Sequence, residues 1–195
     1  MAAEKWNFDN VHSSIEFTVR HLLVSKVRGR FTRWSGAFLY DEKNPTASSV
    51  EVQIEVASVD THEAQRDAHL RSGDFFEAEK HPQITFKSTG VDAKGAGALA
   101  LRGDLTIRGV TRPVVLDVEL GGHLKDPWGN DRVGFSATTA IDRKDFGITF
   151  NQTLDMGGLA LGEKVDIAIE IEATRAKDTA KSANENANDG GAVAP

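Results

Sequence analysis

The sequence contains no cysteine, so disulfide bonds, iron–sulfur clusters and thiol chemistry are excluded. It also lacks long apolar runs. The first ten residues reach charged side chains at once, and no stretch approaches the roughly 20 apolar residues of a membrane-spanning helix. No secretory signal is visible. We therefore expect a cytoplasmic protein without a membrane span.

Concentrated positive charge is scarce as well. The net charge is −6, and an acidic protein is a poor nucleic-acid binder because phosphate neutralisation needs a strong positive field. The first 40 residues are the exception, with six basic side chains against three acidic ones. We expect no nucleic-acid partner, although this basic segment is suited to meeting one anionic group.

Length and composition are those of one soluble globular domain. A chain of 195 residues with 39% hydrophobic residues can bury a sizeable core but is short for two domains. Residues 176–195 have neither periodicity nor large apolar groups, which predicts a disordered C-terminal tail. The folded domain is therefore expected over residues 1–175.

The clearest pattern lies at residues 103–118, where apolar residues alternate with polar ones on both sides of a short polar break. This pattern predicts two strands joined as a hairpin. Similar alternation elsewhere gives one apolar and one wet face per strand, as in antiparallel sheets. The predicted strands are residues 14–21, 27–40, 48–57, 83–91, 97–108, 112–124, 131–142 and 163–174. Several are about ten residues long, or roughly 33 Å.

One helix is predicted, over residues 61–72. Asp60 followed by Glu63 resembles a capping box, and Gly73 stands where a left-handed C-terminal cap is expected. The helix has little apolar surface, so we expect it to lie across an opening or an edge. Such a helix cannot cover eight strands, so the apolar strand faces must meet one another. A closed barrel and a sandwich both achieve this, and long up-and-down strands favour an eight-stranded all-β barrel.

The inward-facing residues of such a barrel form the candidate ligand-binding set. An extended apolar chain would suit a lumen lined by Phe17, Val19, Val52, Ile54, Phe86, Leu105, Leu116 and Phe135. His21 follows Phe17 and Val19 in the alternation, so it is expected on the inward face of the same strand. It is either a hydrogen-bonded core residue or a polar contact that orients a bound head group.

Polar residues of the helix form a second candidate set. His62, Arg66 and His69 have the spacing of a single helix face, which is either a solvated surface or a polar collar at a barrel mouth. Two imidazoles could bind a metal ion, but the positive charge of Arg66 between His62 and His69 opposes this, so no metal site is expected. The alternative function is an enzyme that acts on a small hydrophobic substrate through His21, Arg66 and His69.

Three other motifs favour ordinary structural roles. Residues 95–100 match a loose dinucleotide fingerprint but lead into a strand, so they indicate a hairpin turn. Asp9, His12 and Ser13 contain the letters of a catalytic triad, yet consecutive residues that enter a strand are typical of turn chemistry. The basic residues Lys26, Arg28, Arg30 and Arg33 indicate either a solvated face or a patch that holds an anionic diphosphate or carboxylate.

Taken together, several segments resemble the YceI-like family of polyisoprenoid-binding, lipocalin-like bacterial proteins. The similarity extends over about residues 6–174 in the family's order, and each piece alone is weak. The matching segments are Asp9-x-x-His12-Ser13, Phe17, Val19, His21, Gly29-x-Phe31, Arg66-Asp67-x-His69-Leu70, Asp74-Phe75-Phe76, His81-Pro82-x-Ile84-x-Phe86, Gly103-x-Leu105-Thr106-Ile107-Arg108-Gly109-Val110-Thr111 and Arg143-x-Asp145-Phe146-Gly147.

The resemblance implies an elongated eight-stranded antiparallel barrel that forms a homodimer. Its ligand would be a long amphiphilic lipid such as a polyisoprenoid, an isoprenoid quinone or a fatty amide. The matched positions Phe31, Leu70, Phe75, Phe76 and Phe146 join the candidate ligand-binding set. We expect non-catalytic binding, transport or storage of this lipid, with no cofactor or catalytic residue.

Overall fold

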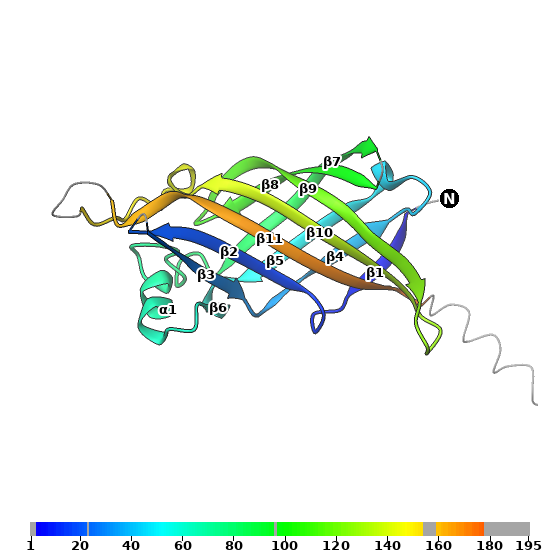
Figure 1. The fold of residues 1–195 in the computed structure, drawn as a ribbon, viewed down its shortest axis with the longest axis horizontal. Helices are drawn as coiled ribbons and strands as arrows, with labels where there is room; N and C mark the ends of the chain where they lie inside the picture. The colour runs from blue at the N-terminus through cyan, green and yellow to red at the C-terminus, as the bar shows by residue number, and fades with distance from the viewer. Residues whose placement is uncertain (1–2, 23, 96, 154–158, 178–195) are drawn as a thin grey trace, which may run out of the picture.

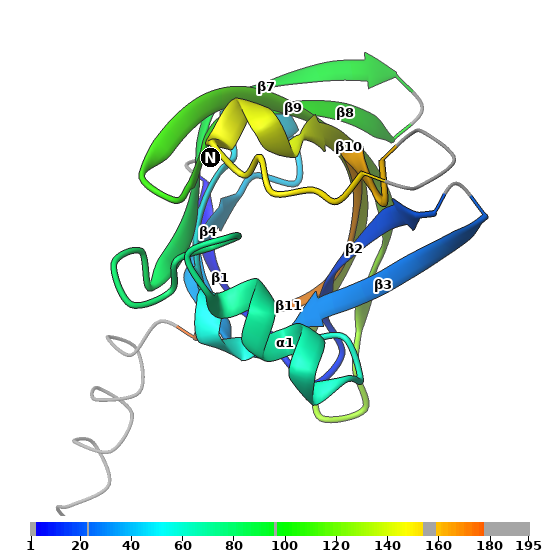
Figure 2. The ribbon, with the colours of Figure 1, turned by 90° about the vertical axis from the view of Figure 1, so that its left-hand side faces the viewer.

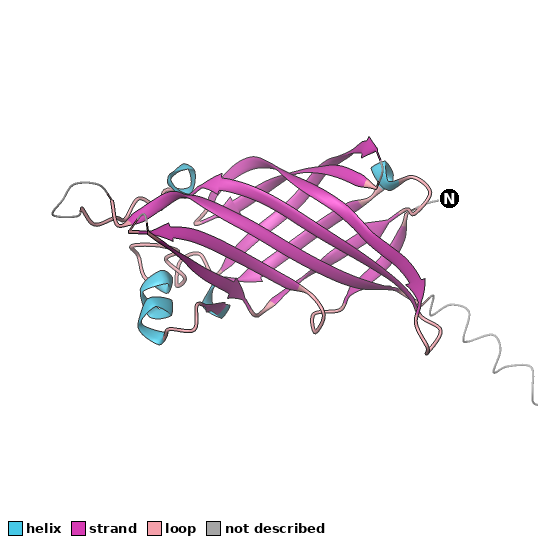
Figure 3. Ribbon diagram, in the orientation of Figure 1, coloured by secondary structure: helices cyan, strands magenta, loops and turns pink. Residues whose placement is uncertain are grey.

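The computed structural model describes residues 3–22, 24–95, 97–153 and 159–177. Strands dominate these residues and wrap into an elongated barrel (Figures 1 and 3). The strands are β1 (Glu4–Phe8), β2 (Ser14–His21), β3 (Ser25–Phe31), β4 (Trp34–Tyr40), β5 (Ser49–Glu55), β6 (Val59–Asp60), β7 (Gln83–Gly95), β8 (Ala98–Ile107), β9 (Val110–Lys125), β10 (Asp131–Asp142) and β11 (Leu161–Arg175). The helical elements are α1 (Ala64–Arg71), η1 (Pro45–Ala47), η2 (Val56–Ser58) and η3 (Arg143–Phe146).

The barrel closes because β1 pairs with β11 as well as with β4. Traced through the described residues, the closed ring is β1-β4-β5-β7-β8-β9-β10-β11, which is eight antiparallel strands. Strands β2, β3 and β6 continue the wall beside β11, because β2 pairs with β11 beyond the end of β1. The predicted eight-stranded antiparallel barrel is therefore confirmed, and the sandwich alternative is not what the chain forms.

The predicted strand over residues 27–40 is wrong in one respect, because it is two strands with a corner between them. Thr32 and Arg33 leave the ladder there, and their amides donate to the carbonyl and the hydroxyl of Ser58 (3.1 Å each). The 3₁₀ turn η2 breaks the neighbouring strand at the same level. Strand β1 was not predicted, although Trp6 and Phe8 alternate with polar neighbours and Trp6 is buried.

The hairpin at residues 103–118 is confirmed as β8 and β9. Arg108 and Gly109 occupy its two-residue turn with positive φ angles of 52° and 74°, which is the backbone twist that suits a tight hairpin. In the glycine-rich motif at residues 95–100, Gly95 ends β7, residues 98–100 begin β8, and Gly95 and Gly97 both have positive φ. Both motifs therefore serve as turns.

The helix is shorter than predicted and is capped differently. Its N-cap is Glu63, whose carboxylate accepts hydrogen bonds from the amides of Gln65 (3.0 Å) and Arg66 (2.6 Å). Asp60 instead accepts from the amide of His62. The helix ends at Ser72 in an extended conformation, so Gly73 is not a left-handed cap. The capping prediction was wrong because the helix begins only after Glu63, so Glu63 is itself the N-cap and not the third residue of the helix.

Helix α1 lies at one end of the barrel, together with the β2–β3 turn and η3 (Figure 2). We call this the α1 end. Within the described residues, no helix has the length and apolar character needed to cross a membrane. The predicted tail begins within the described residues, but its residues 178–195 lie outside them, so its disorder stays a prediction.

Candidate functional site

A cavity of about 530 Å³ runs inside the barrel, a size typical of small-molecule sites. All sixteen residues of the candidate set line it. They are Phe17, Val19, His21, Phe31, Val52, Ile54, Arg66, His69, Leu70, Phe75, Phe76, Phe86, Leu105, Leu116, Phe135 and Phe146. Their contact with a ligand stays a prediction.

Strand pairing explains why the wall is apolar. Because side chains alternate between the two faces of a sheet, residues paired across strands share a face. On β2, Phe17 pairs with Ile167 of β11, and Val19 pairs with Val165 of β11. Farther round the ring, Val52 pairs with Phe86, which in turn pairs with Leu105. The alternation seen in the sequence therefore converts directly into an apolar lumen.

Two glycines make room for aromatic side chains of the wall. A Cβ atom added at Gly29 would lie 2.3 Å from Cζ of Phe17, and one added at Gly103 would lie 2.3 Å from Cζ of Phe86. Such contacts are far closer than van der Waals distance. The two rings therefore lie against glycine backbone in the wall, which leaves more of the lumen open.

Nitrogen-bearing side chains gather at the α1 end of the cavity. Its lining there includes His21, Arg66, His69, Arg143 and Gln152. His69 donates to or accepts from Asp74, with 2.8 Å between Nε2 and Oδ2. Its ring also packs edge-on against Phe75 and Phe150, with centroids 5.0 Å away in both cases. This end therefore combines an aromatic wall with polar groups.

Arg66 is held by the loop that precedes α1. Its Nε donates to Oγ1 of Thr61 and its Nη2 to the carbonyl oxygen of Thr61, both at 2.7 Å. Thr61 is buried and donates from its amide and hydroxyl to Oδ1 of Asp67. His62 has a φ of 60° and lies before the helix, so the predicted shared face of His62, Arg66 and His69 is wrong.

Sequence reasoning missed Arg143 as a lining residue. Only 5% of it is exposed, and burial lowers the pKa of its guanidinium, against the opposing fields of Glu163 and Asp142. Its Nε donates to the carbonyl oxygen of Gly162, and its Nη1 to those of Ile148 and Phe150. The motif Arg143-x-Asp145-Phe146-Gly147 was the available signal, but it did not reveal that the arginine side chain turns inward.

The three residues of the enzyme alternative are not assembled into a unit. His21, Arg66 and His69 all line the cavity, but no hydrogen bond or ion pair among the described residues joins any two of them. A nucleophile that is activated by a neighbouring base needs such a contact, within about 3 Å. The three side chains therefore reach the cavity separately, each with a hydrogen-bonding group available to a polar part of a ligand.

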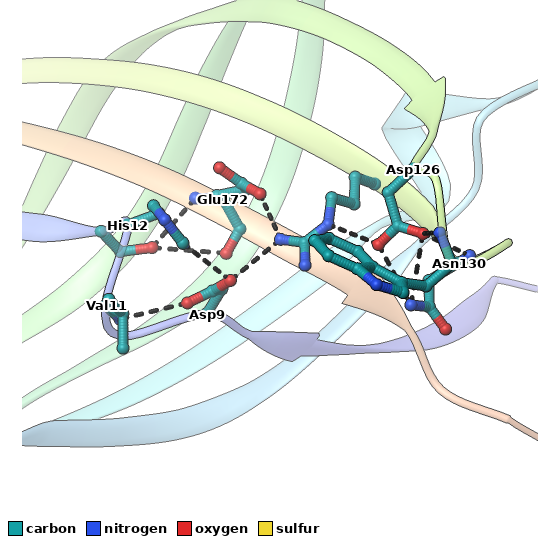
Figure 4. Close-up of polar contacts among 9 residues, drawn as sticks. Asp9, Val11, His12, Asp126, Asn130 and Glu172 are labelled. Atoms are coloured by element: carbon teal, nitrogen blue, oxygen red, sulfur yellow. Dashed lines mark hydrogen bonds and ion pairs between the residues drawn. The ribbon is translucent and has the colours of Figure 1, made fainter.

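The other end of the barrel has a different polar cluster, centred on Arg132. Its guanidinium contacts Asp9 (2.9 Å), Asp126 (2.9 Å) and Glu172. Figure 4 shows Asp9 with Glu172 on one side of this cluster and Asp126 with Asn130 on the other. Asp9, His12 and Glu172 have ligand atoms close enough for a metal ion, but Nη1 of Arg132 already contacts both carboxylates.

The expected turn role is confirmed for Asp9, whereas Ser13 bonds the backbone of β11 rather than that of its own turn. Oδ1 of Asp9 accepts from the amide of Val11, and Oγ of Ser13 bridges the amide and carbonyl groups of Glu172. Beside the cluster, Phe38 and Tyr40 of β4 contact Phe135 of β10, with centroids 5.5 Å and 5.2 Å away. Because β4 and β10 are not neighbours in the ring, these contacts cross the lumen and narrow it.

The basic residues of β3 and the following corner lie outside the cavity. Arg30 pairs with Asp60 (3.1 Å) and Arg33 pairs with Glu55 (2.6 Å). Lys26 and Arg28 are exposed, and neither is among the lining residues. This placement favours the solvated-face interpretation over an anion-holding patch of the pocket.

Comparison with known proteins decides the family. The sequence matches the YceI-like domain family over residues 6–173. The chain belongs to this family. A UPF0312 protein of Pectobacterium carotovorum subsp. carotovorum is 46% identical over 178 residues, which cover 91% of this chain and 89% of that protein.

Two solved structures have a fold similar to that of this chain. A YceI protein of Campylobacter jejuni has a TM-score of 0.71 and 34% identity, covering 81% of this chain and 90% of that chain. A polyisoprenoid-binding domain from Saccharophagus degradans, implicated in plant cell wall breakdown, has a TM-score of 0.63 and 15% identity, covering 89% and 99%. The latter similarity concerns the fold alone.

Proposed function

We propose that this YceI-like barrel binds a long-chain amphiphilic lipid in its lumen and carries or stores it without catalysis. The observation that carries the proposal is the cavity of about 530 Å³, whose wall is almost entirely apolar along the strands and polar at the α1 end. An extended tail fits the apolar length, and a head group fits the polar end. Polyisoprenoids, isoprenoid quinones and fatty amides all have this construction.

The energetics support useful affinity. Burying about ten methylene groups at ~0.8 kcal/mol each contributes roughly 8 kcal/mol. Association and ordering costs reduce this sum. Before these costs, roughly 8 kcal/mol corresponds to a dissociation constant of about 1 μM, so ten methylene groups set about micromolar affinity as an upper limit. The polyisoprenoid-binding description of the Saccharophagus degradans structure supports the same class of ligand.

The proposal is tested by asking whether the lumen holds lipid. We expect native mass spectrometry of freshly purified full-length protein to show a bound mass, and organic extraction to release a long-chain lipid. Ala137 is buried in the cavity wall on β10, so Ala137→Phe fills the lumen and abolishes retention. Its neighbour Thr138 is exposed and outside the lining, so Thr138→Phe is the matched control and retains the lipid.

An empty lumen in every preparation, together with no binding of added lipids by the unaltered chain, would overturn the proposal. Two further expectations belong to it. A cytoplasmic location is tested by cell fractionation, and a homodimer by sedimentation of the purified protein at several concentrations. Neither expectation is needed for lipid binding itself.

A further inference from the structure

Two guanidinium groups at the α1 end of the cavity have no carboxylate partner. Arg66 and Arg143 both line the cavity, and neither takes part in any ion pair within the described residues. Most arginines of the barrel wall are paired, as Arg30, Arg33 and Arg132 illustrate. Among the described residues, the lining therefore holds two guanidinium groups that form no ion pair, and its one carboxylate is that of the exposed Glu16.

Arg143 has the greater need of a partner, because its guanidinium group is buried. Three backbone carbonyl groups accept from its Nε and Nη1, while Nη2 has no hydrogen-bond partner within the described part of the chain. A buried charge without an opposite charge is costly, because it loses the solvation it has in water. Backbone carbonyls satisfy its hydrogen atoms only in part and leave the net charge.

Nearby acidic groups are engaged elsewhere. Glu163 is paired with Lys144, and Asp142 caps the turn η3 by accepting from the amide of Lys144. Asp67 accepts from Thr61, which also holds Arg66. None of these three carboxylates forms an ion pair with Arg66 or Arg143 in the described part of the chain.

Arg66 adds an available donor at the same end. Its Nε and Nη2 are both committed to Thr61, which fixes the guanidinium relative to the wall, and Nη1 makes no hydrogen bond with other described residues. An arginine fixed in this way is suited to an oxyanion, because charge-assisted hydrogen bonds are roughly twice as strong as neutral ones.

From these contacts we infer that the cavity selects lipids whose head group is an oxyanion, a carboxylate or a phosphate, held at the α1 end by Arg66 in the positive field of Arg143. The inference rests on the proposed function, because it names the head group of the lipid bound there. The tail extends along the apolar wall toward the narrowing formed by Phe38, Tyr40 and Phe135. Neutral alcohol and amide head groups bind more weakly.

The test uses delipidated full-length protein and four lipids with the same oleyl chain: oleate, oleyl phosphate, oleyl alcohol and oleamide. Calorimetric titration below the micelle concentration measures each dissociation constant. We expect at least one of the two anions to bind about tenfold tighter than both neutral lipids, the scale of a hydrogen bond to a charged group. Comparison of oleate with oleyl phosphate identifies which oxyanion is preferred.

Two arginine variants locate the preference. Arg66→Gln removes the cation and is expected to weaken binding of the preferred anion about tenfold while changing oleyl alcohol affinity by less than about twofold. Arg71→Gln is the matched control, because Arg71 is on the same helix but does not line the cavity. It is expected to leave all four affinities unchanged.

The outcomes separate this inference from the proposed function. If none of the four lipids binds, the oxyanion inference is overturned, and the proposed function is contradicted as well when the freshly purified protein also holds no lipid. If all four bind with equal affinity, lipid binding stands and the oxyanion preference is overturned. If the preference persists undiminished in Arg66→Gln, the assignment to Arg66 is wrong. The head-group comparison uses the unaltered chain, so it decides the question even where a variant fails to fold.

Discussion

Arg132 at one end of the barrel and the two cavity-lining arginines at the α1 end, Arg66 and Arg143, have opposite surroundings. Arg132 is surrounded by Asp9, Asp126 and Glu172, so its charge is more than neutralised within the protein. At the α1 end, Arg66 and Arg143 contact hydroxyl and carbonyl oxygens and no carboxylate in the described structure. The first arrangement fastens strands together, and the second leaves charge for a ligand.

The difference indicates which end is built for stability and which for exchange. At the Arg132 end, polar groups join the β1–β2 loop, the β9–β10 turn and β11, and aromatic contacts narrow the lumen. At the α1 end, short elements and turns carry the cavity's polar residues. The aromatic contacts that narrow the lumen all lie at the other end. We therefore expect ligand to enter at the α1 end.

Removing the guanidinium of Arg132 should have the largest effect. Arg132→Ala leaves Asp126 buried without its charge partner, and breaking such a pair from one side is strongly destabilising. We expect the melting temperature to fall by about 10 °C. Thermal unfolding followed by circular dichroism measures the change.

Arg112→Ala is the control for that experiment, since Arg112 is exposed and bonds only to a neighbouring carbonyl. A change of less than about 2 °C is expected for it, in line with an ordinary surface substitution. Equal effects of the two substitutions would mean that the Arg132 cluster does not fasten the barrel.

Much of this architecture is visible in the sequence, for a physical reason. Alternating apolar residues place one face of each strand inward, so both the barrel and its lining follow from the pattern of residues such as Phe17, Val19, Val52 and Ile54. The predictions failed where a single side chain overrides the pattern. Ser58 organises a corner that splits one predicted strand into two, and no periodicity reveals that contact.

The candidate site shows the same limit. The position of Arg66 on the wall follows from the helix lying at the opening, but its bonds to Thr61 depend on how the preceding loop turns. Arg143 belongs to a recognisable motif, yet arginine is seldom buried, so its sequence suggests an exposed side chain. Spatial partners supplied by distant segments decide both cases.

The pH dependence of stability sharpens the comparison at the Arg132 end. The pKa of Asp9 is lowered from 3.8 to about 2, chiefly by a hydrogen bond with His12. Burial raises this pKa, and a hydrogen bond from Arg132 lowers it further. Burial alone would raise the pKa of Asp126, but hydrogen bonds from Arg132 and Asn130 outweigh it and hold that pKa below its usual range. Both carboxyls therefore bind protons less readily in the folded state than in the unfolded state.

For such depressed pKa values, the stabilisation is present above the unfolded pKa and is lost as the pH falls through the folded pKa. We expect Asp9→Asn to be less stable at neutral pH and to lose less stability than the unaltered chain between pH 3.8 and about 2. Urea unfolding across this range measures both changes. Asp117→Asn, in an exposed pair with Lys94, should keep the original slope. Parallel curves for Asp9→Asn and the unaltered chain would refute this assignment.

The smallest expected effect concerns Arg108, which ties together the α1 end. Its Nη1 donates to the carbonyl oxygen of Gly147 (2.9 Å) and its Nη2 to that of Gly73 (3.0 Å), while Glu77 accepts at 3.4 Å. Arg108→Ala should therefore release the segment after α1 and the turn η3. We expect faster amide hydrogen exchange over residues 73–77 and 143–148, with a melting temperature lowered by less than about 5 °C.

Arg102→Ala is the matched control, because Arg102 belongs to the neighbouring stretch of β8 and forms an exposed pair with Asp92. It should leave exchange at the α1 end unchanged. If Arg108→Ala instead accelerates exchange throughout the barrel, as Arg132→Ala is expected to do, the α1 end is not an independently opening unit. A local response would link the turn between β8 and β9 to the opening of the cavity. The reason is that Arg108, in this turn, bonds the segment after α1 at Gly73 and the end of η3 at Gly147.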